Sequence, residues 1–468
     1  MKMQPLKLCF PIVCFILFIS STALANNYYI DPTSNTGIEN GTLDNPWTTM
    51  NFINSSIFLP GDTVFIKNGQ TYPGNWYLSR SGAVGHPIVY MGYGAGSMPA
   101  IIYSIGSNIA IHIANASYVV IDGFKITDPS IASDIAHNVL SNINQGILLE
   151  NSNNCTIKNC DISLVGTGIE LNLGSDYTTV TNNHIYNLRM VVNTPKEINP
   201  NDDCGANGVN LQSSYNTITY NKIEDAWAVS YDYSYDGGVI EFFENTNNNT
   251  IMYNSASFCN GFLEIGSSGS ATSTNNVIAY NKVTNCGNAG YFHAQGQVFG
   301  TYIYNIQYYN NVFVQTSTLG YSFDPVFFGS SGTPAAGMLI AKNNIFWSTV
   351  GTNFGDGTLN SSNFLHANNM INLRSGLPDT TLSSSDLTVI VSPWTTTSGD
   401  PSTWNYALPA RSAAINFGMP VGLTTDFAGN PILGNPDAGI LEYSSSADTA
   451  LKATITATPI SLMGAFQL

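Results

Sequence analysis

Two glutamates occupy the same place in successive copies of a short repeat. Glu241 lies in GGVIEF and Glu264 in GFLEI, so each follows a glycine within a short apolar run. Alternate side chains of a β-strand point to opposite faces, which predicts that the apolar neighbours point inward and both glutamates outward. If the copies stack, the carboxylates stack as well. Like charges at that spacing repel, so the pair must take up a proton, bind a cation or accept strong hydrogen bonds.

Each of these outcomes predicts a different chemistry. Calcium takes carboxylate and carbonyl oxygens as ligands, and the region supplies several. The candidate ligands are Asn210, Glu241, Glu264, Asp202, Asp203, Asp232 and Asp236. With a cation bound, the base that removes a proton beside a uronate carboxylate would be His293 or one of Tyr231, Tyr233 and Tyr235. Without a metal, two carboxyl groups about 5 Å apart suit a retaining glycoside hydrolase, with one as acid and one as nucleophile.

The element that positions these residues is a sequence repeat of roughly 30 residues between positions 101 and 350. Its copies include NTITYNKI, NTIMYNSA and NVIAYNKV, and aligning them predicts a column of asparagines in turns. The column comprises Asn183, Asn221, Asn254, Asn281, Asn310 and Asn343, with Cys160 before them. Such a period is too short for βαβ units with full helices. It favours an all-β parallel β-helix, also termed a β-solenoid, with three short strands per turn.

A second column precedes the asparagines in each copy and contains the two glutamates. Its expected outward members are Leu148, Glu170, Asn210, Glu241, Glu264 and His293. Two long segments, 186–207 and 226–238, interrupt neighbouring copies just before this column and are rich in acids and tyrosines. Long loops over one face of a rigid scaffold commonly carry function. The residues expected to bind substrate there are Arg189, Lys196, Trp227, Tyr231, Tyr233 and Tyr235.

Composition and charge set the compartment and exclude some partners. The first 25 residues have the basic start, apolar run and Ala-Leu-Ala site of a secretory leader, and no other run is long enough to span a membrane. The net charge of −16 argues against nucleic acid as a partner. We expect a secreted monomer with a leader at 1–25, an N-terminal cap with a short helix at 26–100 and the β-helix at 101–350. We expect the final rungs and an irregular C-terminal cap at 351–443. A weakly ordered tail follows at 444–468.

Several phrases resemble secreted right-handed parallel β-helix proteins, a group that includes polysaccharide lyases, some glycoside hydrolases and uronate epimerases. These phrases are GTLDNPWTTMNFI, PGDTVFIKNGQTY, GHPIVYMGYGAG and DFAGNPILGNPDAGILEY. The chondroitinase-B and alginate-lyase type is a closer comparison. There an Asn and two Glu on neighbouring rungs hold a calcium ion that neutralises the substrate uronate, which implies this role for Asn210, Glu241 and Glu264. The lysine and arginine that act as base and acid in that type are missing here: EIGSSGS has no lysine, and His293 stands where an arginine is expected.

Together these patterns favour a protein that cleaves a polysaccharide. Calcium-assisted β-elimination on a uronate-containing glycan comes first, and hydrolysis by Glu241 and Glu264 is the alternative. A non-catalytic glycan-binding or surface protein is a third interpretation, in which the aromatic loops bind glycan and the acids only tune the affinity. No organic cofactor is expected.

Overall fold

The computed structural model describes residues 25–444, except 54–56, 105, 107, 318–325, 356, 373–382 and 396. The predicted leader and tail lie outside these residues apart from positions 25 and 444. Within the described residues, no helix is long and apolar enough to cross a membrane.

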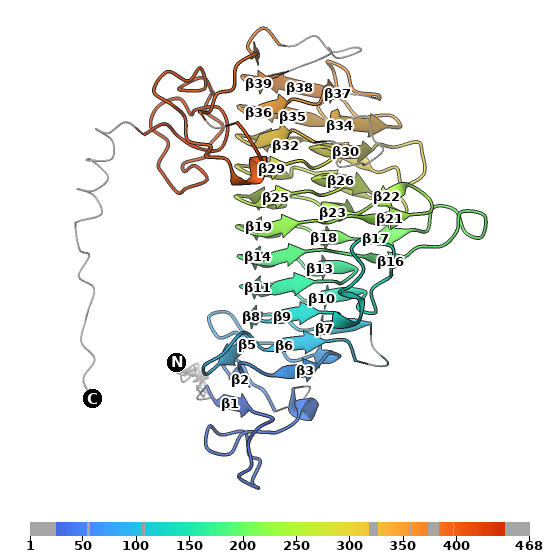
Figure 1. Cartoon of the computed structure of the whole chain (residues 1–468), viewed down its shortest axis with the longest axis vertical. Coiled ribbons are helices and arrows are strands. Elements are labelled where there is room, and N and C mark those ends of the chain that lie inside the picture. Colours follow the sequence, from blue (N-terminus) through green and yellow to red (C-terminus); the bar gives the residue numbers. More distant parts are fainter. Residues whose placement is uncertain are drawn as a thin grey trace, which may run out of the picture.

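Three long parallel sheets, which we call A, B and C, run side by side along the molecule (Figure 1). From β2 (Thr63–Lys67) to β39 (Met370–Ile371) the chain visits them in the order A, B, C in each turn. Sheet A contains β1 (Asn27–Ile30), β2 (Thr63–Lys67), β5 (Ile88–Tyr93), β8 (Val119–Asp122), β11 (Thr156–Lys158), β14 (Thr179–Thr181), β19 (Thr217–Thr219), β24 (Thr250–Met252), β28 (Val277–Ala279), β32 (Ile306–Tyr309), β35 (Leu339–Lys342) and β38 (Phe364–Ala367). Sheet B contains β3 (Thr71–Pro73), β6 (Ala100–Ile102), β9 (Lys125–Thr127), β12 (Asp161–Ser163), β15 (His184–Tyr186), β20 (Lys222–Glu224), β25 (Ser255–Ser257), β29 (Lys282–Thr284), β33 (Val312–Gln315), β36 (Ile345–Ser348), β39 (Met370–Ile371) and β40 (Leu387–Thr388). Sheet C contains β4 (Trp76–Leu78), β7 (Ile109–Ala114), β10 (Gln145–Glu150), β13 (Thr167–Leu171), β18 (Asn207–Leu211), β23 (Gly238–Phe243), β26 (Leu263–Gly266), β30 (Gly290–His293), β34 (Val326–Ser331) and β37 (Asn353–Gly355).

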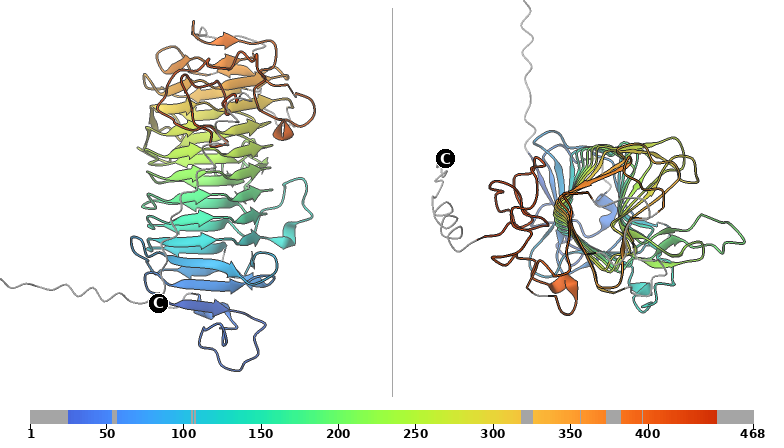
Figure 2. Two further views of the ribbon diagram at one scale, coloured as in Figure 1. Left: turned by 90° about the vertical axis from the view of Figure 1, so that its left-hand side faces the viewer. Right: turned by 90° about the horizontal axis from the view of Figure 1, so that it is seen from above.

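The three sheets enclose an interior, as the view from above shows (Figure 2), and buried apolar side chains make this interior the core. Each turn contributes one or more inward residues from every sheet; Ile218, Ile223 and Val209, one from each sheet, are all fully buried. Branched apolar side chains fit this position because they pack well on a pleated surface. The predicted all-β parallel β-helix is therefore confirmed. The five cysteines within the described residues are all unpaired, and only Cys204 is exposed.

The N-terminal cap contains less helix than the sequence pattern predicts. Trp47, Met50, Ile53 and Ile57 have helical spacing, but the structure has only a 3-10 turn, η1 (Met50–Phe52). Thr49 precedes it without a side-chain capping hydrogen bond, and the side chain of Ile57 is 47% exposed. The spacing thus reflects the burial of Trp47 and Ile53 rather than one continuous helical face.

The irregular C-terminal segment, residues 389–444, lies along the side of the β-helix (Figure 1). It includes the 3-10 turn η3 (Pro401–Thr403). The Tyr253 hydroxyl donates to the Thr425 carbonyl at 3.2 Å, and the Asn310 side-chain amide donates to the Asp437 carbonyl at 2.8 Å. The segment therefore packs on turns between sheets A and B.

A ladder of buried asparagines follows the turns between sheets A and B. Each Asn Oδ1 accepts the backbone N–H of the residue one rung earlier, at 2.9–3.0 Å. The ladder comprises Asn183, Asn221, Asn254, Asn281, Asn311, Asn344 and Asn369. The predicted column is correct up to Asn281 and wrong by one residue afterwards: Asn310 and Asn343 take the left-handed turn position, with φ of 54° and 61°.

Replacing Asn254 with alanine is expected to lower the free energy of unfolding by about 1–3 kcal/mol. Its Oδ1 accepts the Asn221 backbone N–H at 2.9 Å, and its side-chain N–H donates to the Ile218 carbonyl at 2.8 Å, so the substitution leaves buried groups unpaired. Urea unfolding measures the difference. Asn138→Ala, at an exposed asparagine, is the control. Equal stability of the two variants would contradict a contribution of the asparagine ladder to the free energy of unfolding.

Candidate active site

The outward column of sheet C contains both glutamates on adjacent rungs. Parallel pairing places Glu170 beside Asn210, Asn210 beside Glu241, and Glu241 beside Glu264. Their inward neighbours in the strands are fully or almost fully buried. The predicted stacking of the two glutamates is therefore confirmed.

The next place in the column belongs to Tyr291, which the sequence alignment missed. Glu264 pairs with Tyr291, so His293 lies two residues further along β30. The predicted position of His293 in the column is therefore wrong. It still reaches the site, because its Nε2 lies 2.8 Å from Glu264 Oε1.

Glu241 is surrounded by amide donors and other carboxylates. The side-chain amides of Asn207 and Asn210 both donate to its Oε2, the second at 3.4 Å. Burial, and then the negative charges of Glu264, Asp236 and Glu170, raise the pKa of Glu241 well above its ordinary value. The protonated form of Glu241 is therefore favoured unless a cation compensates its charge.

Glu264 is more open to solvent, with 46% of its side chain exposed. His293 approaches one of its oxygens, while the Gln297 side-chain nitrogen lies 3.4 Å from His293 Nδ1. Because an amide N–H can only donate, Nδ1 is the acceptor, and Nε2 carries the hydrogen that it donates to Glu264. Both ring nitrogens of His293 are thus engaged, and the histidine orients Glu264.

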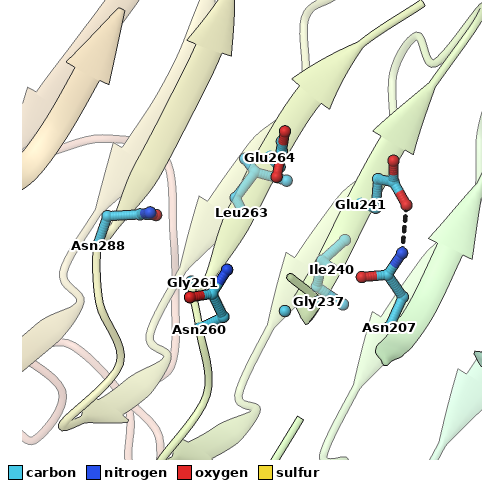
Figure 3. A pocket seen from close by; sticks show the side chains of 10 residues that line it. Asn207, Gly237, Ile240, Glu241, Asn260, Gly261, Leu263, Glu264 and Asn288 are labelled. Atoms are coloured by element: carbon cyan, nitrogen blue, oxygen red, sulfur yellow. Dashed lines mark hydrogen bonds between the residues drawn. The ribbon is translucent and has the colours of Figure 1, made fainter. Parts of the chain in front are cut away.

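A small hollow lies beside the two glutamates, at the start of their strands (Figure 3). Gly238 and Gly261 line it, and their missing side chains leave a volume of about 20 Å³, enough for a water molecule or an ion. Asn207, Asn260 and Asn288 also line it. The Oδ1 atoms of Asn260 and Asn288 are buried and find no hydrogen-bond partner among the described residues.

The two long loops form antiparallel hairpins that hold an acidic cluster. One contains β16 (Met190–Val192) and β17 (Cys204–Gly205), and the other contains β21 (Ala228–Ser230) and β22 (Ser234–Asp236). Both project from the same side of the molecule, between sheets B and C (Figure 1). Asp202, Asp203 and Asp232 each present a carboxylate oxygen within 4.8 Å of the others. We call these three residues the Asp triad.

The Asp triad has the chemistry of a cation site. Asp203 Oδ2 accepts from the Ser230 hydroxyl at 2.6 Å and from the Asp232 backbone N–H at 2.9 Å, so the hairpins hold the triad in place. Asp202 Oδ1 and Asp232 Oδ1 are buried and, across the described ranges, accept no hydrogen bond. Buried carboxylate oxygens without donors are what a divalent cation would satisfy.

The structure divides the predicted ligand set into two groups. Asp202 and Asp203 join Asp232 in the triad, whereas Asn210, Glu241 and Glu264 lie on sheet C. Asp236 is outside the triad. Burial and the charge of Glu264 raise its pKa to about 8.

The raised pKa of Asp236 predicts a pH dependence of stability in the metal-free protein. As pH rises from about 4, the unfolded chain releases this proton before the folded state does, so stability falls until the pH reaches about 8. The slope from one such carboxyl is at most about 1.4 kcal/mol per pH unit. Asp236→Asn is expected to remove this part of the slope when urea unfolding is measured across that range with a chelator present. An unchanged slope would contradict the assignment.

The predicted substrate-binding residues occupy different environments. Arg189 is fully buried, and its Nε donates to Asp134 Oδ2 at 3.2 Å, so it anchors the segment 128–144 instead of facing a substrate. Trp227 stacks on His137 with ring centroids 4.1 Å apart, meets the edge of Tyr235, and donates its indole N–H to Asp225 at 2.6 Å.

The remaining members of that set lie on the hairpins. Lys196 is exposed, the Tyr231 side chain is 61% exposed, and Tyr233 is partly buried among the acids. Burial and the charges of Asp236 and Asp232 raise the pKa of Tyr233. These residues can still meet a substrate that crosses the hairpins.

Sequence reasoning missed the asparagines of the hollow. Asn207 pairs with Gly238, three residues before Glu241, and Asn288 stands three residues before Tyr291. An alignment of the residues three places before the outward column would have identified Asn207, Gly238, Gly261 and Asn288 as a set. The segment 128–144, with η2 (Pro129–Ile131), was missed because no motif marks it.

No protein-family model and no curated protein matches the sequence. Among solved structures, the pectate lyase Pel9A matches with 16% identity over 90% of this chain and 96% of its own, with a TM-score of 0.55. XylC in complex with xylose matches with 11% identity over 89% and 99%, with a TM-score of 0.50. At these identities the likeness establishes the fold. The chain has the fold of right-handed parallel β-helix proteins, as the sequence resemblance predicted.

Proposed function

We propose that this protein is an exported enzyme that cleaves a uronate-containing polysaccharide by β-elimination at Glu241 and Glu264. The observation that carries the proposal is the Asp triad, with two buried carboxylate oxygens that no donor among the described residues satisfies. The triad lies close to the site, because burial and the charge of Glu264, together with the charges of Asp203 and Asp232, raise the pKa of Asp236. The fold similarity to a pectate lyase supports the same class of reaction.

Asp202, Asp203 and Asp232 would hold a divalent cation of the calcium type. Bound there, the cation would supply positive charge that neutralises a substrate carboxylate and makes the neighbouring proton more acidic. Such a charge would offset the repulsion between a polyanion and a protein of net charge −16. It would also offset the local negative charge of Glu264, Asp236 and Glu170, which together with burial raises the pKa of Glu241.

The two glutamates have opposite roles in this mechanism. Glu264 is exposed, and His293 donates to one of its oxygens, so it is placed to remove the proton at C5 of the uronate. The electron pair forms the C4–C5 double bond and breaks the bond from C4 to the glycosidic oxygen. Glu241 holds a proton on the oxygen that Asn207 and Asn210 leave free, and gives it to the departing oxygen. His293 is then a positioning residue.

Hydrolysis is the second candidate, because the same pair also fits it. Glu241, with its raised pKa, and the half-exposed Glu264 lie on adjacent rungs, and the rung spacing of about 4.8 Å is close to the separation that a retaining acid and nucleophile need. In that mechanism the Asp triad would bind the cation only to hold the glycan or the hairpins.

A polysaccharide panel separates the candidates. Each polymer is incubated with the protein in calcium and in chelator, and both reducing ends and the ultraviolet absorbance of a new double bond are followed. Elimination predicts equal gains in both signals, and loss of both in chelator. Reducing ends without absorbance would instead establish hydrolysis. Retention on immobilised glycan without products from any polymer would replace both with a binding function.

A further inference from the structure

The outward column that contains Glu241 and Glu264 continues with an aromatic residue. Pairing places Tyr291 beside Glu264 on one side and beside Gly329 on the other. Adjacent rungs are about 4.8 Å apart, so Tyr291 stands next to the residue that we assign as the base.

The tyrosine ring lies over a glycine that leaves room for it. A Cβ atom at Gly329 would lie 2.6 Å from Cδ2 and 2.8 Å from Cε2 of Tyr291, too close for any side chain unless the ring moved. On another side, the ring meets the His293 ring at 61°, with centroids 5.0 Å apart. The backbone of β34 and the imidazole therefore fix the ring beside Glu264.

The hydroxyl of this tyrosine is available to a ligand. Throughout the described ranges, no residue forms a hydrogen bond with it, and it is not one of the buried atoms that lack a partner. Tyr308 differs, since its buried hydroxyl donates to the Ala289 carbonyl at 2.9 Å. Tyr291 thus combines a fixed ring with an exposed polar tip, which suits contact with a sugar.

We propose that Tyr291 is a substrate-binding residue, which contacts the sugar unit bound on the C-terminal side of Glu264 along the β-helix. Its ring packs against the pyranose and its hydroxyl bonds to a sugar hydroxyl. This inference rests on the proposed function of the same site. The same inference explains the glycine at position 329, since any side chain there would displace the Tyr291 ring.

Three substitutions test the inference by steady-state kinetics on a cleaved polymer. Tyr291→Ala is expected to raise KM about tenfold, and Tyr291→Phe to raise it less because the ring stays. Gly329→Ala adds one methyl group beneath the ring and is expected to raise KM although the tyrosine is intact. Tyr177→Ala is the control, because Tyr177 is exposed in a turn outside the column. Thermal unfolding shows that each variant is folded.

The outcomes separate the inference from the proposed function. If the wild-type protein cleaves polymer and Tyr291→Ala keeps its KM, the inference is wrong while the proposed function stands. If the wild-type protein cleaves nothing, the proposed function fails. The affinity for uronate oligosaccharides, measured by calorimetry, then tests whether Tyr291 contacts sugar. Weaker binding by Tyr291→Ala than by Tyr177→Ala supports a contact with sugar. Equal binding, or none by any form, overturns it.

Discussion

Glu241→Gln is expected to reduce the rate of polysaccharide cleavage by at least about a hundredfold, with the fold unchanged. The substitution keeps the size of the side chain and its place beside Asn207, but it removes the proton that the raised pKa of Glu241 retains. Initial rates on the best polymer of the panel measure the loss. KM should change little, because the departing oxygen needs the proton only in the transition state.

Glu150→Gln is the matched control for this experiment. Glu150 is on sheet C as well, but its side chain is 54% exposed and lies 3.1 Å from His112, away from the hollow. It should keep full activity. If Glu241→Gln cleaved polymer as fast as the wild-type protein, Glu241 would not be the acid.

Asp232→Asn is expected to weaken calcium binding by at least about tenfold. The substitution removes a negative charge from the Asp triad, and Asp232 Oδ1 is one of the buried oxygens without a donor in the described structure. Because Asp232 Oδ2 also accepts the backbone N–H of Asp202 at 3.0 Å, some loosening of the hairpins should accompany the loss. Calorimetric titration of metal-free protein with calcium measures the affinity, and added calcium should restore part of the cleavage rate.

Asp44→Asn, at an exposed aspartate in the N-terminal cap, is the control for lost charge alone. It should bind calcium as the wild-type protein does. Equal affinities of the two variants would remove the triad as the cation site and leave Glu241 and Glu264 as the candidates for cation binding.

The fold was predictable because every rung repeats the same local signals. Inward isoleucines and valines recur from rung to rung, and from Asn183 onward an asparagine side chain accepts a backbone N–H of the rung before it, so a few aligned copies define the coil. Errors arose where a copy departed from the pattern. The doubled asparagines at 310–311 and 343–344 shifted the column by one, since an asparagine fits either turn position and only the backbone conformation decides which of the two joins the ladder.

The site was predictable for the residues that the repeat itself contains. Glu241 and Glu264 follow the strand register, so their pairing followed from the alignment. Tyr291 was missed because the histidine two residues later suggested a chemically better match.

Contacts between segments far apart in the sequence could not be predicted. Arg189 lies in a long loop of the sequence and has the type of a substrate-binding cation. In the structure the segment 128–144 covers it, and no local sequence pattern predicts that contact. The Asp triad combines residues of two hairpins, and their relative placement depends on tertiary packing.

The mass of the products from a defined uronate oligosaccharide tests the central claim most directly. Elimination at Glu241 and Glu264 adds no water, so the masses of the two fragments should add up to that of the substrate, and one fragment should carry the unsaturated uronate. Cleavage should stop in chelator and in Glu241→Gln. Fragments that together gained one water would contradict elimination, and an intact substrate under all conditions would contradict cleavage at this site.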